Sequence, residues 1–251
     1  MLYFTDLDNT VIYSHRHMIQ DSIVWVESLN GRKQSFVSER TYRFFKLQKW
    51  LNVVPITTRT YQQYSRLKDM TEAFGWKHVL ILNGAILLQN GVEDTEWKKE
   101  SISICDADRQ AYIEALKLAQ KIAGEDSVLS VDPFMFYIKT DNVKGVFNVL
   151  YNRVDRIHLS VLSDARKVYC FPVSMNKGYA AERYMERFGY DQFIAAGDSE
   201  FDIPMLEKAD VSLCPDGLRD FNTNGIKKVC SGLFSDSICD ELEQLKKRYY
   251  C

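Results

Sequence analysis

Apolar residues in the N-terminal part of the chain occur either in short unbroken runs or at helical spacing. The short runs end abruptly in acidic or turn-forming residues, which is typical of buried strands. The predicted strands are 1–5, 53–56 and 78–82, and the predicted helices are about 38–51 and 61–74. Between the first strand and the first helix, Asn30-Gly31 separates two further apolar runs, 23–26 and 34–37, and this dipeptide favours a hairpin turn. Strands that alternate with helices in this way predict a parallel sheet with helices on both faces.

The middle of the chain follows a different pattern. After a short strand at 85–89, helix-strand-strand occurs twice: helix 107–122, strands 128–131 and 134–139, helix 142–154, strands 157–162 and 167–171. This order indicates an α+β unit and not a continuation of the parallel sheet. The first pattern then returns, with helices at 179–188, 203–208 and 237–248 and strands at 193–196, 211–213 and 226–229. The sequence therefore predicts an α/β core of 1–84 and 173–251 interrupted by an inserted domain of 85–172.

Composition and charge exclude some classes of protein. Hydrophobic residues at 46% and charged residues at 26% fit an ordinary globular protein, and a net charge of −2 without a Lys/Arg block argues against a nucleic-acid partner. No apolar run suits a signal peptide or a membrane helix, so we expect a cytoplasmic protein without a membrane partner. The six cysteines are far apart and are expected to be buried free thiols.

Acidic, hydroxyl and basic residues follow the predicted core strands. Since ligands of open α/β sheets bind outside the carboxyl ends of the strands, these residues are expected to meet at one edge. Each has an ordinary alternative on its own, because an Asp-x-Asp is common in loops, a Thr often caps a helix and a Lys-Gly is usually solvated. In chain order they are Asp6 with Asp8, Thr57, Lys177, and Asp198 with Asp202. Their joint order along an α/β chain is far more specific.

Together these motifs, beginning with Asp6-Leu7-Asp8-Asn9-Thr10, resemble the haloacid dehalogenase (HAD) superfamily of phosphotransferases, whose first motif is Asp-x-Asp-x-Thr/Val. The resemblance spans essentially the whole chain. It implies a Rossmann-like HAD core and, for the αββαββ insertion, a type C2 cap. Asn83-Gly84-Ala85 at the cap entrance is similar to subfamily IIB, the group of Cof-type sugar phosphatases and sucrose phosphatase.

The resemblance implies a phosphatase that uses Mg²⁺ and acts on a small-molecule phosphate ester, of the class of sugar phosphates and related metabolites. Asp6 is then the nucleophile that forms an aspartyl-phosphate, and Asp8 is the general acid and later the general base. A phosphate dianion repels a carboxylate, so a divalent cation with oxygen ligands is needed between them. The implied metal ligands are Asp6, Asp8 through its carbonyl, Asp198 and Asp202. The implied phosphate ligands are Thr57, Thr58 and Lys177, with Arg59 and Asn83 as substrate-binding residues.

Two positions depart from the Cof-like pattern. Phe201 stands where Gly-Asp-x-x-Asn-Asp has its Asn, and Thr58 stands where Thr-Gly-Arg has its Gly. Substrate specificity is expected in the cap, where the candidates are Tyr137, Lys139, Arg153 and Arg166. Two alternatives remain open, a phosphomutase of the phosphomannomutase type and a non-catalytic module that binds a phosphate ligand. Neither the substrate nor the oligomeric state follows from the sequence.

Overall fold

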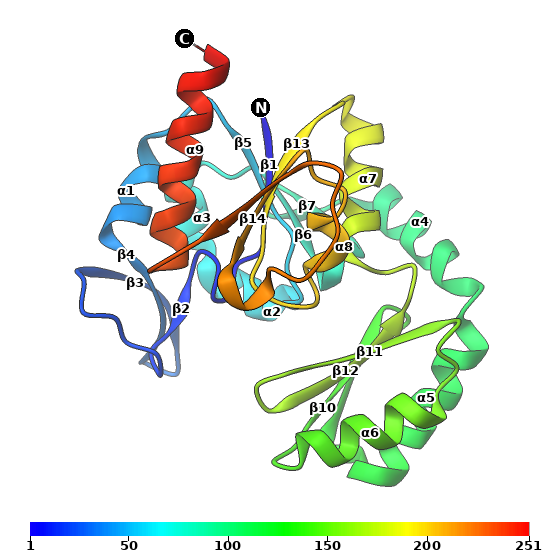
Figure 1. Cartoon of the computed structure of the whole chain (residues 1–251). Coiled ribbons are helices and arrows are strands. Elements are labelled where there is room, and N and C mark those ends of the chain that lie inside the picture. Colours follow the sequence, from blue (N-terminus) through cyan, green and yellow to red (C-terminus); the bar gives the residue numbers. More distant parts are fainter. Residues whose placement is uncertain (251) are drawn as a thin grey trace.

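The computed structural model describes the backbone of residues 1–250 and the side chains of residues 1–248. Its centre is a parallel sheet of order β15-β14-β13-β1-β5 (Figure 1). These strands are β1 (Leu2–Thr5), β5 (Asn52–Pro55), β13 (Phe193–Ala196), β14 (Val211–Pro215) and β15 (Ile226–Cys230). Beside β5, a bridge between Ile56 and Leu80 adds β6 (His78–Ile81), which pairs antiparallel with β7 (Ile86–Gln89), and β7 pairs with β8 (Val92–Glu93). The prediction of a parallel α/β sheet is confirmed.

Helices cover both faces of this sheet, which explains why the first three residues of β1, Leu2 to Phe4, are apolar. Tyr3 packs on one side, with the first group of helices, whereas Leu2 and Phe4 pack on the other, with the second group. The first group is α1 (Glu39–Leu47), α3 (Lys68–Phe74) and α9 (Phe234–Tyr250). The second group is α4 (Thr95–Asp106), α7 (Lys177–Phe188) and α8 (Ile203–Leu206). A strand buried on both faces is mostly apolar, and the charged residues begin where it leaves the sheet.

The helix boundaries differ from the predicted ones in three places. The helix expected at 61–74 is divided into α2 (Tyr61–Tyr64), a short 3-10 turn and α3. The helices expected at 38–51 and 203–208 end earlier, at Leu47 and Leu206. Helix α4 was not expected, because only Trp97, Ser101 and Cys105 are buried, a row too narrow to stand out in a polar segment.

The predicted hairpin is present and follows β1 almost directly. It consists of β3 (Ile23–Leu29) and β4 (Arg32–Ser38), and β4 also pairs with the short β2 (Tyr13–Ser14). Asn30 and Gly31 have φ angles of 52° and 73°, as the turn requires. In Figure 1 this hairpin lies at the left, below α1.

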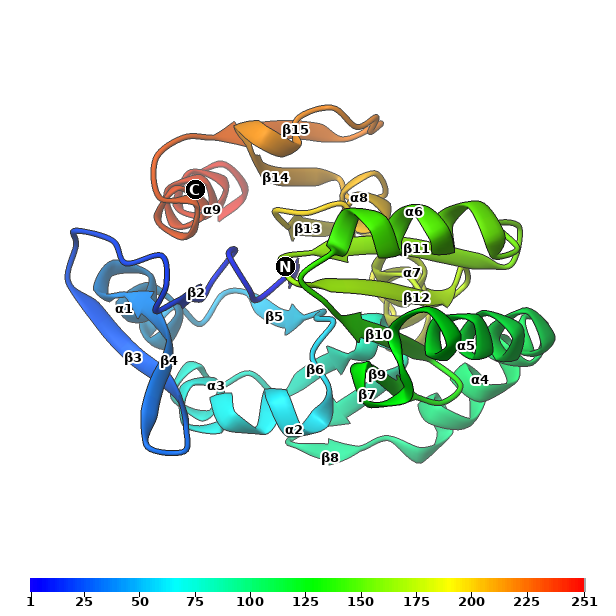
Figure 2. The ribbon, with the colours of Figure 1, turned by 90° about the horizontal axis from the view of Figure 1, so that it is seen from below.

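The predicted αββαββ insertion is also present. Its antiparallel sheet has the order β11-β12-β10-β9, and α5 and α6 cover one face (Figure 2). The elements are α5 (Arg109–Ala123), β9 (Val128–Val131), β10 (Met135–Lys139), α6 (Val143–Arg153), β11 (Leu159–Asp164) and β12 (Lys167–Pro172). Phe136 and Cys170 point toward the helices, whereas Tyr137, Tyr169 and Phe171 belong to the cluster that continues into the core. The domain limits at 84/85 and 172/173 remain a prediction, because strand pairing alone does not define a folding unit.

The cysteines of the described residues are free and buried, as expected: Cys105, Cys170, Cys214, Cys230 and Cys239. Cys251 lies outside the described residues. Among the helices of the described chain, none combines the length and the apolar character that crossing a membrane requires.

Candidate active site

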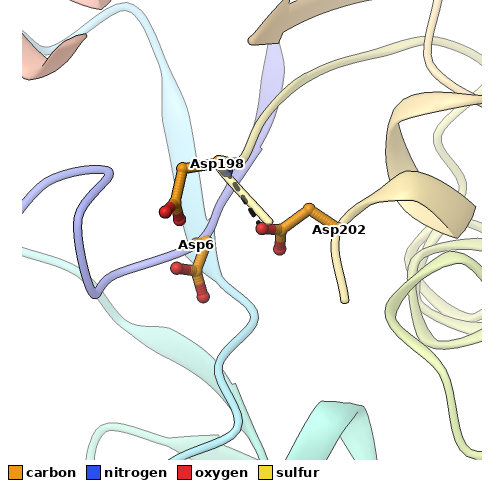
Figure 3. A group of neighbouring side chains, drawn as sticks. All are labelled: Asp6, Asp198 and Asp202. Carbon is orange, nitrogen blue, oxygen red and sulfur yellow. Dashed lines mark hydrogen bonds between the residues drawn. The ribbon is translucent and has the colours of Figure 1, made fainter. Parts of the chain in front are cut away.

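Three carboxylates meet where β1 and β13 end. Asp6 follows β1, and its N–H donates to the carbonyl of Ala196 (2.9 Å), so it leaves the sheet beside the loop that carries Asp198 and Asp202. Figure 3 shows the three side chains directed toward one another, and one oxygen of each lies within 4.8 Å of the others. Clustered carboxylate oxygens are the ligands that Mg²⁺ prefers, so the residues present fit a divalent cation.

Asp202 fixes the loop on which Asp198 lies. Its Oδ2 accepts hydrogen bonds from the N–H groups of Asp198 and Ser199 and from the Ser199 hydroxyl, each at 3.0 Å. The loop passes so close to Asp202 that a Cβ at Gly197 would lie 2.3 Å from the Asp202 Cβ. Glycine is therefore required at this position, and Asp198 is held by backbone geometry as well as by the Thr10 hydroxyl (3.1 Å).

Lys177 supplies the cation that the carboxylates need. It is the first residue of α7, its side chain is 1% exposed, and its Nζ donates to Asp6 Oδ1 and to Asp202 Oδ1 (2.6 Å). Burial alone would lower the pKa of Lys177, but Asp202 and Asp6 outweigh it and raise that pKa. The side chain thus stays charged at neutral pH, in contact with the predicted nucleophile.

One lysine does not balance the acidic charge. Burial raises the pKa of Asp6 well above its ordinary value, and Asp202, Asp198 and Asp8 add to this against the opposing effect of Lys177. Burial, and then Asp202, raise the pKa of Asp198 to about 7. Burial and mutual repulsion oppose the simultaneous ionisation of these carboxylates. A bound dication would favour their charged forms.

Asp8 lies beside this cluster, with its side chain 49% exposed to the cleft. Both of its oxygens accept hydrogen bonds from Arg59, from Nε at 2.8 Å and from Nη2 at 2.7 Å. Burial opposes ionisation, but the hydrogen bonds and charge of Arg59 outweigh it and hold the pKa of Asp8 below its usual value. Arg59 is thus bonded to the predicted general acid, and its expected contact with substrate remains a prediction.

The remaining predicted phosphate and substrate residues differ in exposure. Thr58 lines the cleft, whereas Thr57 and Asn83 are 0% and 2% exposed. The Thr57 hydroxyl oxygen accepts the N–H of Arg59 (3.2 Å), and the Asn83 N–H donates to the Thr57 carbonyl (2.9 Å). Their roles toward phosphate and substrate stay predictions.

A small pocket of about 40 Å³ lies over the carboxylates and borders a cleft of about 440 Å³. Both are lined by Asp8, Thr58, Asp164 and Tyr169. Two larger hollows, of about 560 and 720 Å³, lie beside α1 and beside α4. Neither is lined by the three clustered carboxylates, so volume alone does not identify the site.

The cap candidates are only partly at this cleft. Tyr137 lines it, whereas Lys139 and Arg153 are exposed and do not line the pockets beside the carboxylates. Arg166 is exposed and pairs with Asp141. The sequence reasoning missed Lys167, whose Nζ lies 4.9 Å from the ring centre of Tyr137 and lines the cleft. Lys167 is the first residue of β12, directly after a turn. The alternation of residues along a strand does not by itself predict that such a side chain reaches the cleft.

Phe201 connects β12 with the loop that carries Asp198 and Asp202. Its ring lies 5.2 Å from that of Tyr169, edge to face, and 5.9 Å from that of Phe171, stacked. The position where the Cof-like pattern has Asn is therefore part of an apolar contact with β12.

The comparisons with known proteins agree with this arrangement. No protein-family model matches the sequence, and no curated protein matches it either. Solved structures do match over nearly the whole chain. Sucrose-phosphatase from Synechocystis sp. PCC6803, in complex with sucrose and phosphate, is 14% identical with a TM-score of 0.62, and the match covers 98% of each chain. A HAD subclass IIB sugar phosphatase is 10% identical with a TM-score of 0.63, covering 97% of this chain and 98% of that one.

A trehalose-6-phosphate phosphatase related protein is 12% identical with a TM-score of 0.51, and the match covers 99% of each chain. At these identities the likeness establishes the fold, and the activity has to be argued from the site. The architecture that the motifs implied is confirmed: the chain has the fold of the HAD-superfamily phosphatases, a Rossmann-like core with an inserted α+β unit.

Proposed function

We propose that the protein is a Mg²⁺-dependent phosphatase that hydrolyses a small-molecule phosphate monoester through an aspartyl-phosphate on Asp6. The observation that carries the proposal is the meeting of Asp6, Asp198 and Asp202 with Lys177 at the carboxyl edge of the sheet, next to Asp8. When bound, Mg²⁺ would neutralise the charge between nucleophile and phosphoryl group. Asp6 and Asp198 would hold it, with the Asp8 carbonyl and Asp202 as the further predicted ligands.

In the first half of the reaction, a carboxylate oxygen of Asp6 attacks phosphorus. The bond between phosphorus and the leaving oxygen breaks, and that oxygen takes a proton from Asp8, so an alcohol departs. The low pKa of Asp8 in the free protein means that it must first gain this proton. A dianionic phosphate entering beside Asp8 disfavours its charged form and raises its proton affinity.

In the second half, Asp8 is the general base. It takes a proton from a water molecule that attacks the phosphoryl group, and the bond between phosphorus and Asp6 breaks to release inorganic phosphate. The proton that Asp8 donates in the first half is regained from water in the second. When phosphate leaves, Asp8 loses this proton to solvent and returns to the ionised form of the free protein. Lys177, already bonded to Asp6, stabilises the negative charge on the transferred group.

The side chains of the larger cleft suit a small polar leaving group. It contains cationic, carboxylate and aromatic side chains, which suit a hydroxyl-rich molecule and not an extended polymer: Arg16, Arg66, Lys167, Asp164, Tyr137 and Tyr169. The sugar phosphatases among the solved structures with this fold support a sugar phosphate or a related metabolite as the substrate class.

The test is a phosphate-release screen with Mg²⁺ across sugar phosphates, phosphorylated polyols and nucleotides. We expect turnover on at least one class of small ester, lost on addition of a chelator. A phosphomutase would instead interconvert isomeric sugar phosphates while releasing little inorganic phosphate. Absence of both activities across the panel would leave only the binding-module alternative.

A further inference from the structure

A buried carboxylate on the β3–β4 hairpin contacts the residues around Asp8. Glu27 lies on β3, and its side chain is 3% exposed. The pairing of β3 with β4 shifts register on both sides of Glu27, and such bulges redirect a side chain. Here the bulge accompanies a carboxylate that points into the protein, where the Ser35 hydroxyl donates to its Oε2 at 2.6 Å.

Two arginines bind this carboxylate. Arg59 Nη2 donates to Glu27 Oε2 at 3.1 Å, and Arg66 Nε donates to Glu27 Oε1 at 3.0 Å. The same Arg59 donates through Nε and Nη2 to the two oxygens of Asp8. Negative and positive side chains thus alternate in one connected row of Asp8, Arg59, Glu27 and Arg66.

Arg59 is held on three sides by this arrangement. Besides its bonds to Asp8 and Glu27, Nη1 donates to the carbonyl of Gln63 at 3.3 Å, and the side chain is only 10% exposed. A guanidinium is a flat fork whose direction decides where a bidentate partner can lie. The direction of the fork in turn limits where the Asp8 carboxylate can lie.

We infer that Glu27 is a positioning residue for catalysis, because through Arg59 it holds the Asp8 carboxylate in line with the leaving oxygen. The inference rests on the proposed function of Asp8. Glu27 does not line the small pocket over the carboxylates. It borders the larger cleft, but its carboxylate oxygens are bonded to Ser35, Arg59 and Arg66, and it reaches Asp8 through Arg59. Proton transfer needs a heavy-atom distance of about 2.6–3.2 Å, and a misplacement of about 1 Å costs on the order of 100-fold in rate.

A purely structural role for Glu27 predicts something different. If Glu27 only secured the hairpin, its loss would lower stability and would slow turnover on all esters equally. If it positions the proton donor, the loss concerns esters whose leaving group needs a proton to depart. The discriminating measurement is therefore the ratio of rates on an alkyl phosphate and on nitrophenyl phosphate.

The experiment compares wild type, Glu27→Gln and the control Glu39→Gln, which removes a carboxylate paired with Arg43 on the surface. All are measured with Mg²⁺ on both esters, after circular dichroism confirms folding. We expect Glu27→Gln to lower kcat/KM on the alkyl ester by about 10- to 100-fold, with a change below about threefold on nitrophenyl phosphate. The readout is kcat/KM because it reports only the steps up to departure of the leaving group, and not the later hydrolysis of the aspartyl-phosphate that every ester shares. Glu39→Gln should resemble wild type.

A double-mutant cycle adds a second test. Arg59→Lys keeps the charge but loses the fork, so it should show the same ester-selective loss, and the double variant should be no worse than the poorer single variant. If Glu27→Gln does not fold, Ser35→Ala removes one bond to Glu27 and should give the same selectivity at smaller size. Equal losses of kcat/KM on both esters, or additive losses in the cycle, would overturn the inference. The alkyl ester is one that wild type hydrolyses in the phosphate-release screen, and inactive wild type across that whole screen would instead overturn the proposed function.

Discussion

Replacing Phe201 by Asn is expected to loosen the contact between the catalytic loop and β12. Phe201 is 6% exposed and touches Tyr169 and Phe171. Burying a Phe side chain is worth about 1.5–3 kcal/mol, and an aromatic pair adds about 0.5–1.5 kcal/mol. With two such pairs, the Phe201 ring contributes roughly 2.5–6 kcal/mol to the arrangement in which β12 lies against the loop.

The loss of the Phe201 contact should be measurable in β12 and in the catalytic loop. We expect Phe201→Asn to lower the free energy of unfolding in urea by several kcal/mol, or to speed amide hydrogen exchange in β12 and in residues 197–202 if the cap separates without global unfolding. KM should rise, since Tyr169 lines the cleft. Phe201→Leu, which keeps most of the apolar volume, is the matched control and should lose less than half as much.

One result would contradict this role of Phe201. If Phe201→Asn stays within about 0.5 kcal/mol of wild type, with unchanged exchange in β12, the aromatic contact is not what keeps β12 beside the loop.

The remaining predictions concern the proton donor and the metal. Asp8→Asn should lose nearly all activity on alkyl esters, and its residual kcat/KM should be largest on nitrophenyl phosphate, whose leaving group departs without a proton; equal losses of kcat/KM on both would argue against the role of proton donor. Chelator should abolish activity and Mg²⁺ restore it, whereas Ca²⁺ should compete without supporting turnover, because its larger, looser coordination shell disturbs the in-line geometry. The pKa of Asp198, about 7 in the metal-free protein, exceeds its unfolded value. The native state therefore binds more protons than the unfolded chain between about pH 4 and 7, so stability relative to Asp198→Asn should fall as pH rises through this window, and Mg²⁺ should reverse the trend. A metal-free difference that grows more favourable with pH would contradict the assignment.

Much of the fold could be predicted because local patterns decide it. β1 is apolar on both faces and is followed by Asp6. Residues 1–6 alone therefore predict both that the strand is buried and that a catalytic candidate follows it. The Asn30-Gly31 turn is likewise local. The helix α4 was missed because its buried row is one residue wide and two of its three members are small.

The contacts that surround the site could not be predicted in the same way. Glu27 looks like an ordinary charged residue in a half-exposed strand, and only the bulge and the approach of Arg59 make it a buried partner. Phe201 could be seen to replace an Asn, but its contact with β12 depends on how a segment 30 residues away in sequence folds back, Phe171 to Phe201. Long-range placement is a property of the packed chain and leaves no periodic signal.

The central claim is that Asp6 becomes covalently phosphorylated during turnover. The most direct measurement is acid quenching of wild-type enzyme turning over a phosphate ester with Mg²⁺, followed by mass spectrometry of the peptide that contains Asp6. The account predicts one added phosphoryl group on Asp6, sensitive to hydroxylamine as an acyl phosphate is, and absent in Asp6→Asn, which should also release no phosphate. Phosphate release by folded Asp6→Asn within tenfold of the wild-type rate, or a phosphoryl group found on another residue, would contradict it.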